Sequence, residues 1–138
     1  VYIAWSAHNR SPLIRVPAAD EHASRIELRS PDPSANPYLS LALVLAAGLE
    51  GIRDKLVPPP STDGNIYAMT AGERKRRKID SLPGDLHEAI QEMKKDKLVK
   101  CVLGEHIFEK YIEAKELEWS EYKTRVSHWE IENYLAKY

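Results

Sequence analysis

The stretch NRSPLIRVPAADEHASRIELRSPDPSANP, from Asn9 to Pro37, decides the fold of this chain. In its densest part, from Arg25 to Arg29, charged and apolar residues alternate at every position. Side chains along a β-strand point to opposite faces with a period of two. The three charged residues are therefore predicted to share one face of a strand. The two apolar residues between them, Ile26 and Leu28, are predicted to turn toward a core.

Arginine is concentrated in the same stretch. A second short β-prone run, Leu13 to Val16, carries Arg15, and Arg10 precedes it. Arginine offers a planar fork of donors that grips phosphate or carboxylate oxygens in pairs, and a carboxylate such as Glu27 can hold a divalent ion against phosphates. The set therefore suits phosphoryl transfer. From the pattern alone, a half-exposed strand whose charges pair with a neighbouring strand is the simpler explanation.

The remaining elements are predicted from local signals. Residues 1–6 are apolar and β-prone, which predicts another strand. Asn36 and Pro37 form a good helix start, and the helix to about Lys55 is apolar enough to predict burial. The basic run GERKRRK at 72–78 is expected to be a solvated loop in preference to a nucleic-acid contact. Further helices are expected at residues 85–95, from 104 or 105 to about 126, and from 127 to about 136.

Bulk properties limit the function classes. The chain has 138 residues, and its formal net charge of −1 argues against a general nucleic-acid or membrane-surface binder. The single cysteine, Cys101, cannot form an internal disulfide and fits a reducing, cytoplasmic setting. The start lacks both a methionine and the long apolar segment of a signal peptide, so we expect a fragment of a longer polypeptide.

Several long strings resemble one enzyme family. NRSPLIRVP, RIELRSPDPSANPYL, AAGLEGI, NIYAM and LGEHIFEKYIEAKELEW are similar to the C-terminal portion of the catalytic domain of bacterial type I glutamine synthetase. These strings are distributed over essentially the whole chain, which is identified as a member of that family. The context of Tyr67, NIYAMTAGE, resembles the α-type, which lacks the regulatory adenylylated tyrosine of the β-type. Tyr67 is accordingly expected to be a packed aromatic residue.

The resemblance implies an α+β fold. Residues 1–30 are expected to supply a few antiparallel strands of the catalytic β-barrel, and residues 31–138 a mainly helical part of the same domain. Enzymes of this type form homo-dodecamers of two stacked hexameric rings, in which each C-terminal helix inserts into a subunit of the facing ring. Residues 127–138 are therefore expected to be an inter-subunit tail.

The resemblance also implies an activity, that of a glutamate–ammonia ligase. The family joins ammonia to glutamate through a γ-glutamyl phosphate, with ATP as co-substrate and Mg²⁺ or Mn²⁺ as cofactor. No nucleic-acid or membrane partner is implied. The isolated chain is expected to be inactive, because most of the family's active site precedes this portion. Two alternatives stay open: a γ-glutamyl-amine ligase of the same family, and a catalytically silent relative that serves as an interaction module.

Roles for individual residues follow from the same resemblance. Arg10 and Arg29 are expected to be catalytic and to bind glutamate. Glu27 is expected to be a metal ligand. The residues expected to contact ATP are Arg10, Arg15, His22, Ala23, Ser24 and Arg25.

Overall fold

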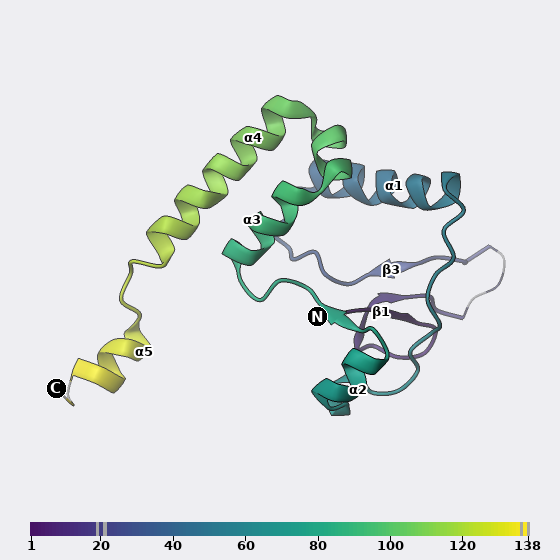
Figure 1. Cartoon of the computed structure of the whole chain (residues 1–138), viewed down its shortest axis with the longest axis horizontal. Coiled ribbons are helices and arrows are strands. Elements are labelled where there is room, and N and C mark those ends of the chain that lie inside the picture. The colour runs from purple at the N-terminus through teal and green to yellow at the C-terminus, as the bar shows by residue number, and fades with distance from the viewer. Residues whose placement is uncertain (19, 21, 136, 138) are drawn as a thin grey trace. The chain divides into compact units, whose positions relative to one another are not determined.

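The computed structural model describes residues 1–18, 20, 22–135 and 137 (Figure 1). The chain divides into two compact units, Val1–Gly84 and Asp85–Tyr138. Each unit has apolar side chains of its own core: Ile66 and Ile79 in the first, and Ile90, Leu103, Phe108 and Ile112 in the second. All of the site residues expected from the sequence belong to the first unit.

The first unit is built on a four-stranded mixed sheet in the order β3-β2-β1-β4. Strand β2 pairs antiparallel with β3, and β1 pairs antiparallel with β4, but β1 and β2 run parallel. The expectation of antiparallel strands is thus correct for two of these pairs and wrong for the third. The strands are β1 (Tyr2–Ser6), β2 (Pro12–Arg15), β3 (Glu27–Leu28) and β4 (Asp80–Ser81).

Strand β3 is shorter than the alternating pattern predicts. Glu27 and Leu28 pair with β2, and the N–H of Arg29 extends the ladder by donating to the carbonyl oxygen of Leu13 at 2.9 Å. Ile26 precedes this pairing and is 63% exposed, so its predicted place in a core is wrong. As an edge strand, β3 has one neighbour to fix its length, and that neighbour is short.

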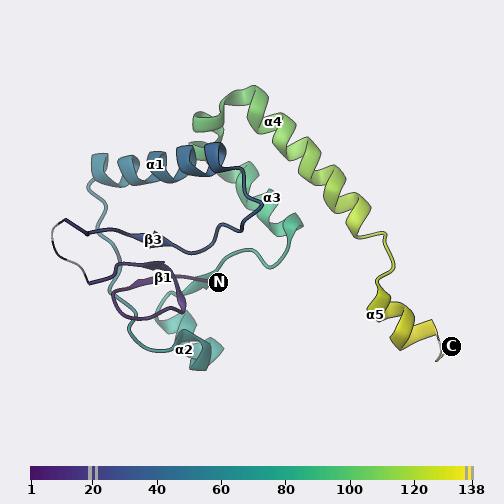
Figure 2. The same cartoon turned by 180° about the vertical axis from the view of Figure 1, so that it is seen from behind.

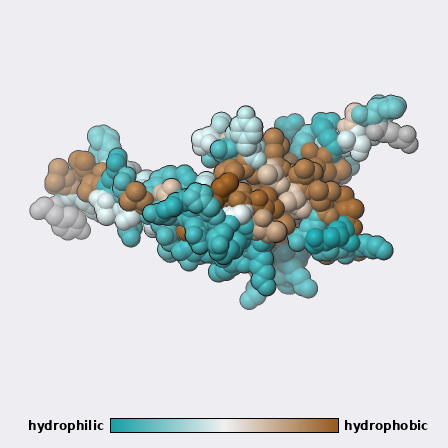
Figure 3. Space-filling model, turned by 90° about the horizontal axis from the view of Figure 1, so that it is seen from above, coloured by the Kyte–Doolittle hydropathy of each residue, from teal (hydrophilic) through white to brown (hydrophobic). Residues whose placement is uncertain are grey.

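Helix α1 (Pro37–Arg53) begins as predicted and is not buried. The Asn36 side chain caps it by accepting from the backbone N–H of Tyr38 at 3.0 Å. None of its residues is buried, and Leu45 and Ile52 are 64% and 75% exposed. The apolar surface over this helix is visible in Figure 3. The prediction of burial was therefore wrong, because an apolar pattern shows what a helix can bury and not what covers it.

The basic run expected to be a loop contains a helix, α2 (Ala71–Arg76). Thr70 and Glu73 form a capping box in which each side chain bonds the other residue's backbone N–H. This Thr-x-x-Glu signal was present in the sequence. Figures 1 and 2 show α2 and α1 on opposite sides of the strands.

A 3₁₀ turn, η1 (Ile66–Ala68), lies just before α2 in the chain. Ile66 is completely buried and belongs to the core of the first unit. Tyr67 is 67% exposed, so the expected packing of this ring was wrong. Its ring lies edge-on to that of Tyr2, with centroids 5.5 Å apart.

The second unit pairs helix α3 (Leu86–Lys95) with helix α4 (Lys97–Tyr122). A lysine–glutamate ion pair and a stacked histidine–tryptophan pair join the two helices. Gly104 interrupts α4 with φ +72° and ψ 159°, so two helical segments meet there. The predicted helix start at 104 or 105 is therefore confirmed as the start of the second segment. Residues that make these contacts between helices are Lys94 with Glu116, and His87 with Trp119.

The tail opens with the predicted capping box of Ser127 and Glu130. Helix α5 (His128–Glu130) continues into a π-helical turn, η2 (Ile131–Leu135). The predicted helix end at Ala136 and the aromatic Tyr138 lie outside the described residues. No helix in the described part of the chain is long and apolar enough to cross a membrane.

Candidate functional site

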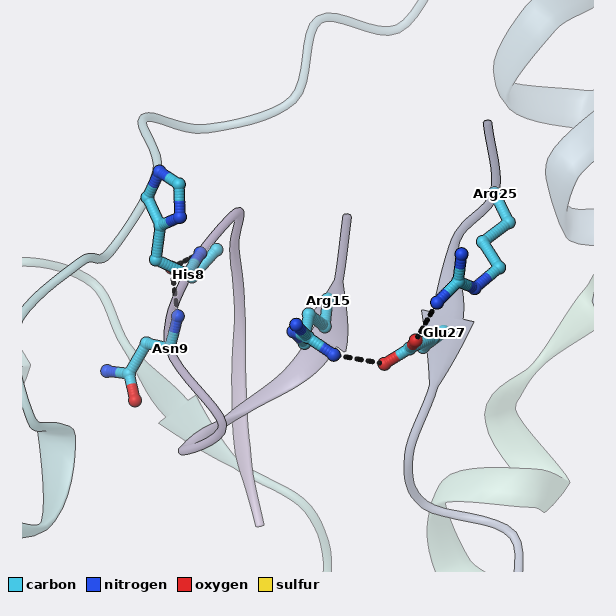
Figure 4. Close-up of polar contacts among 6 residues, drawn as sticks. His8, Asn9, Arg15, Arg25 and Glu27 are labelled. Atoms are coloured by element: carbon cyan, nitrogen blue, oxygen red, sulfur yellow. Dashed lines mark hydrogen bonds and ion pairs between the residues drawn. The ribbon is translucent and has the colours of Figure 1, made fainter. Parts of the chain in front are cut away.

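Three of the predicted site residues meet across β2 and β3. The register places Arg15 opposite Glu27. An Arg15 guanidinium nitrogen (Nη1) lies 3.1 Å from Glu27 Oε2, and an Arg25 guanidinium nitrogen (Nη2) lies 3.1 Å from Glu27 Oε1 (Figure 4). The cross-strand pairing suggested by the pattern is thus present. It places Arg15 and Arg25, which are expected to contact ATP, beside Glu27, the expected metal ligand.

The Glu27 carboxyl group is held in its charged form. Partial burial opposes its ionisation, but hydrogen bonds and charges from Arg15 and Arg25 outweigh this effect and lower the pKa of Glu27. A carboxylate offers about four lone-pair sites, of which the two arginines use two. Mg²⁺ commonly takes one or two protein carboxylates and completes its shell with substrate phosphates and water. Glu27 therefore fits a divalent ion that is also held by phosphate oxygens.

No group of three or more histidine, cysteine, aspartate or glutamate residues in the described part of the chain could hold a metal ion. A metal at Glu27 would therefore need ligands other than side chains of these residues. Arg15 adds a second feature: its Nε atom is buried and has no hydrogen-bond partner among the described residues. Buried donors are nearly always paired in folded proteins, so this N–H is an unused donor beside Glu27.

Arg10 and Arg29 lie apart from this ion-pair cluster. Arg10 is exposed on the turn between β1 and β2, and Arg29 is exposed just after β3. Neither guanidinium makes an ion pair with a described residue. Both remain available to bind an oxyanion, but the structure does not bring them into contact with Glu27.

The segment expected beside the nucleotide, His22 to Ser24, is an exposed loop before β3. The backbone N–H of Ala23 donates to the carbonyl oxygen of Asp20 at 3.2 Å and to its Oδ1 at 2.9 Å. These bonds form an aspartate-stabilised turn, which leaves the side chains of the segment in solvent.

Sequence reasoning missed the residues that hold the Arg10 turn. Ser6, at the end of β1, donates its hydroxyl to Asp63 Oδ1 at 2.8 Å across 57 positions of sequence. Hydrogen bonds donated by Ser6 and Ser61 lower the pKa of Asp63 below its usual value. No local pattern signals a bond of this sequence separation.

Comparison with known proteins identifies the family. A family described as "Glutamine synthetase, catalytic domain" matches residues 1–134. The chain belongs to this family. It is 54% identical over 138 residues to a glutamine synthetase of Clostridium saccharobutylicum, covering 100% of this chain and 31% of that protein. It is 57% identical over 136 residues to one of Methanosarcina mazei, covering 99% of this chain and 30% of that protein.

A solved structure supports the same conclusion for the fold. The structure titled "GmaS/ADP complex-Conformation 1" superposes with a TM-score of 0.81 at 32% sequence identity, covering 96% of this chain and 29% of that one. The glutamine synthetase resemblance and the α+β class are thereby confirmed. The chain spans about a third or less of the length of the curated glutamine synthetases that it matches.

Proposed function

We propose that this chain is the C-terminal part of a glutamate–ammonia ligase, a glutamine synthetase that makes glutamine from glutamate, ammonia and ATP. The observation that carries the proposal is the family match over residues 1–134 together with the ion pairs that Arg15 and Arg25 form with Glu27. Because the chain spans about 30% of its relatives, the activity belongs to a longer protein. We expect the 138-residue chain alone to be inactive.

The reaction proceeds in two displacements. A γ-carboxylate oxygen of glutamate attacks the γ-phosphorus of ATP, ADP leaves, and a γ-glutamyl phosphate forms. Ammonia then attacks the acyl carbon, phosphate leaves with the C–O bond electrons, and a proton is lost from nitrogen. Arg29 and Arg10 would bind the glutamate carboxylate and the phosphoryl oxygens as charge develops on them. Such stabilisation by positioned donors is the main source of catalysis in phosphoryl transfer.

The ion-pair cluster would serve ATP and the metal. The side chains of Arg15 and Arg25 are 27% and 55% exposed, so their guanidinium groups could reach phosphate oxygens while still flanking Glu27. Glu27 would bind Mg²⁺ or Mn²⁺, which when present screens the phosphate charge. The exposed loop from His22 to Ser24 would lie beside the nucleotide. The solved relative is a complex with ADP, which supports nucleotide binding by this fold.

The longer protein is proposed to be a dodecamer of two hexameric rings, at work in the cytoplasm. The exposed aromatic tail, with Trp129 60% and Tyr134 51% exposed, supports a contact made by residues 127–138 with another subunit. Cys101, the only cysteine, is exposed and unpaired, in keeping with a reducing compartment.

The alternative within the family is a γ-glutamyl-amine ligase. The arginines and Glu27 would serve either reaction, since both need the same acyl phosphate. A catalytically silent relative is disfavoured, because it has no need of Arg10, Arg15, Glu27 and Arg29 together.

The test is an assay of the full-length protein with glutamate, ATP and Mg²⁺. Release of phosphate and formation of glutamine should depend on ammonia. Faster turnover with an alkylamine than with ammonia would favour the γ-glutamyl-amine ligase. Absence of phosphate release with either nucleophile, from a folded protein, would contradict the ligase proposal.

A further inference from the structure

The turn that carries Arg10 makes an unusually short connection. Residues 7–11 alone join β1 to β2, and these strands are parallel. A parallel pair normally needs a crossover of about a dozen residues or more, because the chain must return along the strand before it pairs. The five-residue return leaves backbone groups that no sheet ladder can satisfy. Side chains must satisfy them instead.

Ser6 supplies the first set of these bonds. Its side chain is fully buried, and its Oγ accepts from the backbone N–H of His8 at 3.2 Å and of Asn9 at 3.1 Å. The Ser6 hydroxyl donates a hydrogen bond to Asp63 Oδ1 at 2.8 Å. A hydroxyl has one proton and two lone pairs, so this hydroxyl is fully used. Figure 4 shows His8 and Asn9 on this turn, with dashed lines for the bonds at their nitrogen atoms.

Asn9 and Ser11 supply the second set, on either side of Arg10. Asn9 Oδ1 accepts from the backbone N–H of Ser11 at 3.0 Å, and Asn9 Nδ2 donates to the carbonyl oxygen of Gly64. Ser11 Oγ accepts from the backbone N–H of Ile66 at 3.3 Å. The residues before and after Arg10 are thus tied to the 61–66 segment. The Arg10 side chain itself takes no part in these bonds.

We propose that Asp63 is a positioning residue for Arg10, acting through Ser6 and the backbone of the turn. The proposal rests on the proposed function, in which Arg10 binds glutamate and phosphoryl oxygens. An ionised carboxylate only accepts, so it fixes the direction of the Ser6 hydroxyl proton and aims both lone pairs at the turn. Without it, the hydroxyl is free to rotate and to donate elsewhere, and the N–H groups of His8 and Asn9 lose their acceptor.

The consequence is kinetic. Displacement of a catalytic group by about 1 Å can lower turnover by about a hundredfold, even when the altered residue lies away from the chemistry. In the full-length enzyme, Asp63→Ala should lower kcat about tenfold or more, while KM for ammonia, which Arg10 is not proposed to bind, stays within about twofold. Asp63→Asn keeps an oxygen that can accept from Ser6, so it should restore most of the activity.

Ser61→Ala is the matched control. Ser61 Oγ also donates to Asp63 Oδ1, at 2.9 Å, but this bond does not involve the turn. Its loss removes one bond to the same carboxylate and should leave kcat within about twofold of the parent enzyme, the range of ordinary surface changes. A drop with Ser61→Ala equal to that with Asp63→Ala would mean that the loop, and not the turn, is being disturbed.

A double-mutant cycle with Arg10→Ala tests whether Asp63 acts through Arg10. If Asp63 acts through Arg10, Asp63→Ala should change kcat by less than about twofold once Arg10 is gone. Full additivity of the two losses would overturn the proposal, and so would wild-type kcat in Asp63→Ala. If Asp63→Ala does not fold, Ser6→Ala, which removes the acceptor of the His8 and Asn9 N–H groups, takes its place in the cycle, and additivity there overturns the proposal equally. Failure of the proposed function is distinguishable, because the parent protein itself would then be inactive.

Discussion

Glu27 lies between two guanidinium groups, and this explains why its carboxyl stays ionised. Its pKa is lowered by Arg15 and Arg25 despite the opposing effect of partial burial. A carboxyl group with a lowered folded-state pKa contributes stability above its unfolded pKa and loses it as the pH falls through the folded value. At neutral pH Glu27 is therefore available as an anionic ligand. The same charge pairs with both arginines and, in the proposed site, would attract a metal ion.

We expect Glu27→Gln in the full-length enzyme to raise the Mg²⁺ requirement and to cut turnover strongly. An amide lacks the negative charge, so phosphate oxygens would be less well screened, at a cost of about 3–4 kcal/mol by analogy with lost transition-state donors. Titration of activity with Mg²⁺ measures both effects. Asp54→Asn is a suitable control, because Asp54 is also paired with an arginine, Arg53, at the end of α1. Parent-like activity of Glu27→Gln at limiting Mg²⁺ would rule out the metal role.

Substitution of Arg29 tests whether the proposed oxyanion site needs a planar pair of donors. Arg29→Lys keeps the positive charge but loses the planar pair of donors, so kcat should fall by about tenfold or more, as for loss of a bidentate contact. Steady-state kinetics with glutamate as the varied substrate measures the change. The same substitution at Arg76, exposed on α2, should have no effect. Activity of Arg29→Lys within about twofold of the parent enzyme would mean that a simple charge suffices there.

The sequence predicted that the charges of the 25–29 stretch could pair with a neighbouring strand, and it missed what holds Arg10. Arg25 and Glu27 are two positions apart, so the predicted strand places them on the same face, and their ion pair agrees with that, although β3 itself begins at Glu27. The bond between Ser6 and Asp63 spans 57 positions and depends on how the 57–65 loop returns to β1. Local periodicity carries no information on such a return. For this reason the arginines could be named in advance and Asp63 could not.

Three helix starts were predicted well because their signals are local, whereas α2 was missed although Thr70 and Glu73 give a signal of the same kind. Asn36, Asp85 and Ser127 each cap a helix with a side chain that bonds a backbone N–H two or three residues later. The two-residue strands β3 and β4 depend on partners elsewhere in the chain, and the pattern gave β3 too many residues and β4 none. The prediction that α1 is buried failed for the same reason, because burial depends on a second surface that covers the helix.

Gly104 joins the two helical segments of α4 in a backbone conformation that is costly for other residues. Its φ of +72° with ψ of 159° lies in a region that is essentially restricted to glycine, and an added Cβ would meet no atom within 4 Å. Any penalty of Gly104→Ala therefore comes from the backbone, at about 1–3 kcal/mol, and should lower the thermal unfolding temperature of the full-length protein. Gly48, inside α1, also has open space around it but no positive φ, so Gly48→Ala should be neutral or slightly stabilising. Equal shifts for the two variants would contradict this reading of Gly104.

The chain exposes a large number of apolar side chains, and its composition alone does not reveal this. An apolar hollow of about 530 Å³ lies against β1 and β2 and includes Trp5 and the exposed Ile26. The apolar residues of α1 are exposed as well. Monomeric proteins seldom leave contiguous apolar patches larger than a few hundred Å² uncovered. This surface agrees with a chain that spans about 30% of its relatives.

A second exposed apolar surface lies on the tail. Its removal tests the proposed assembly. Terminal segments usually fray unless something holds them, yet Ser127 and Glu130 cap this one and Trp129 packs edge-on against Tyr134 at 5.7 Å. Beside them, Val126, Ile131 and Leu135 line an apolar hollow of about 420 Å³.

We expect deletion of residues 127–138 from the full-length enzyme to leave folded subunits and to weaken pairing of the two proposed rings. The lost apolar contact is intersubunit in this proposal, so the dodecamer should dissociate toward hexamers as the protein is diluted. Light scattering over a range of concentrations measures this, and circular dichroism checks that the subunits remain folded. Thr124→Ala, which changes only hydroxyl bonds to carbonyl oxygens at the end of α4, should leave the assembly intact. A truncated enzyme that stays dodecameric at the lowest concentration would place the tail in its own subunit.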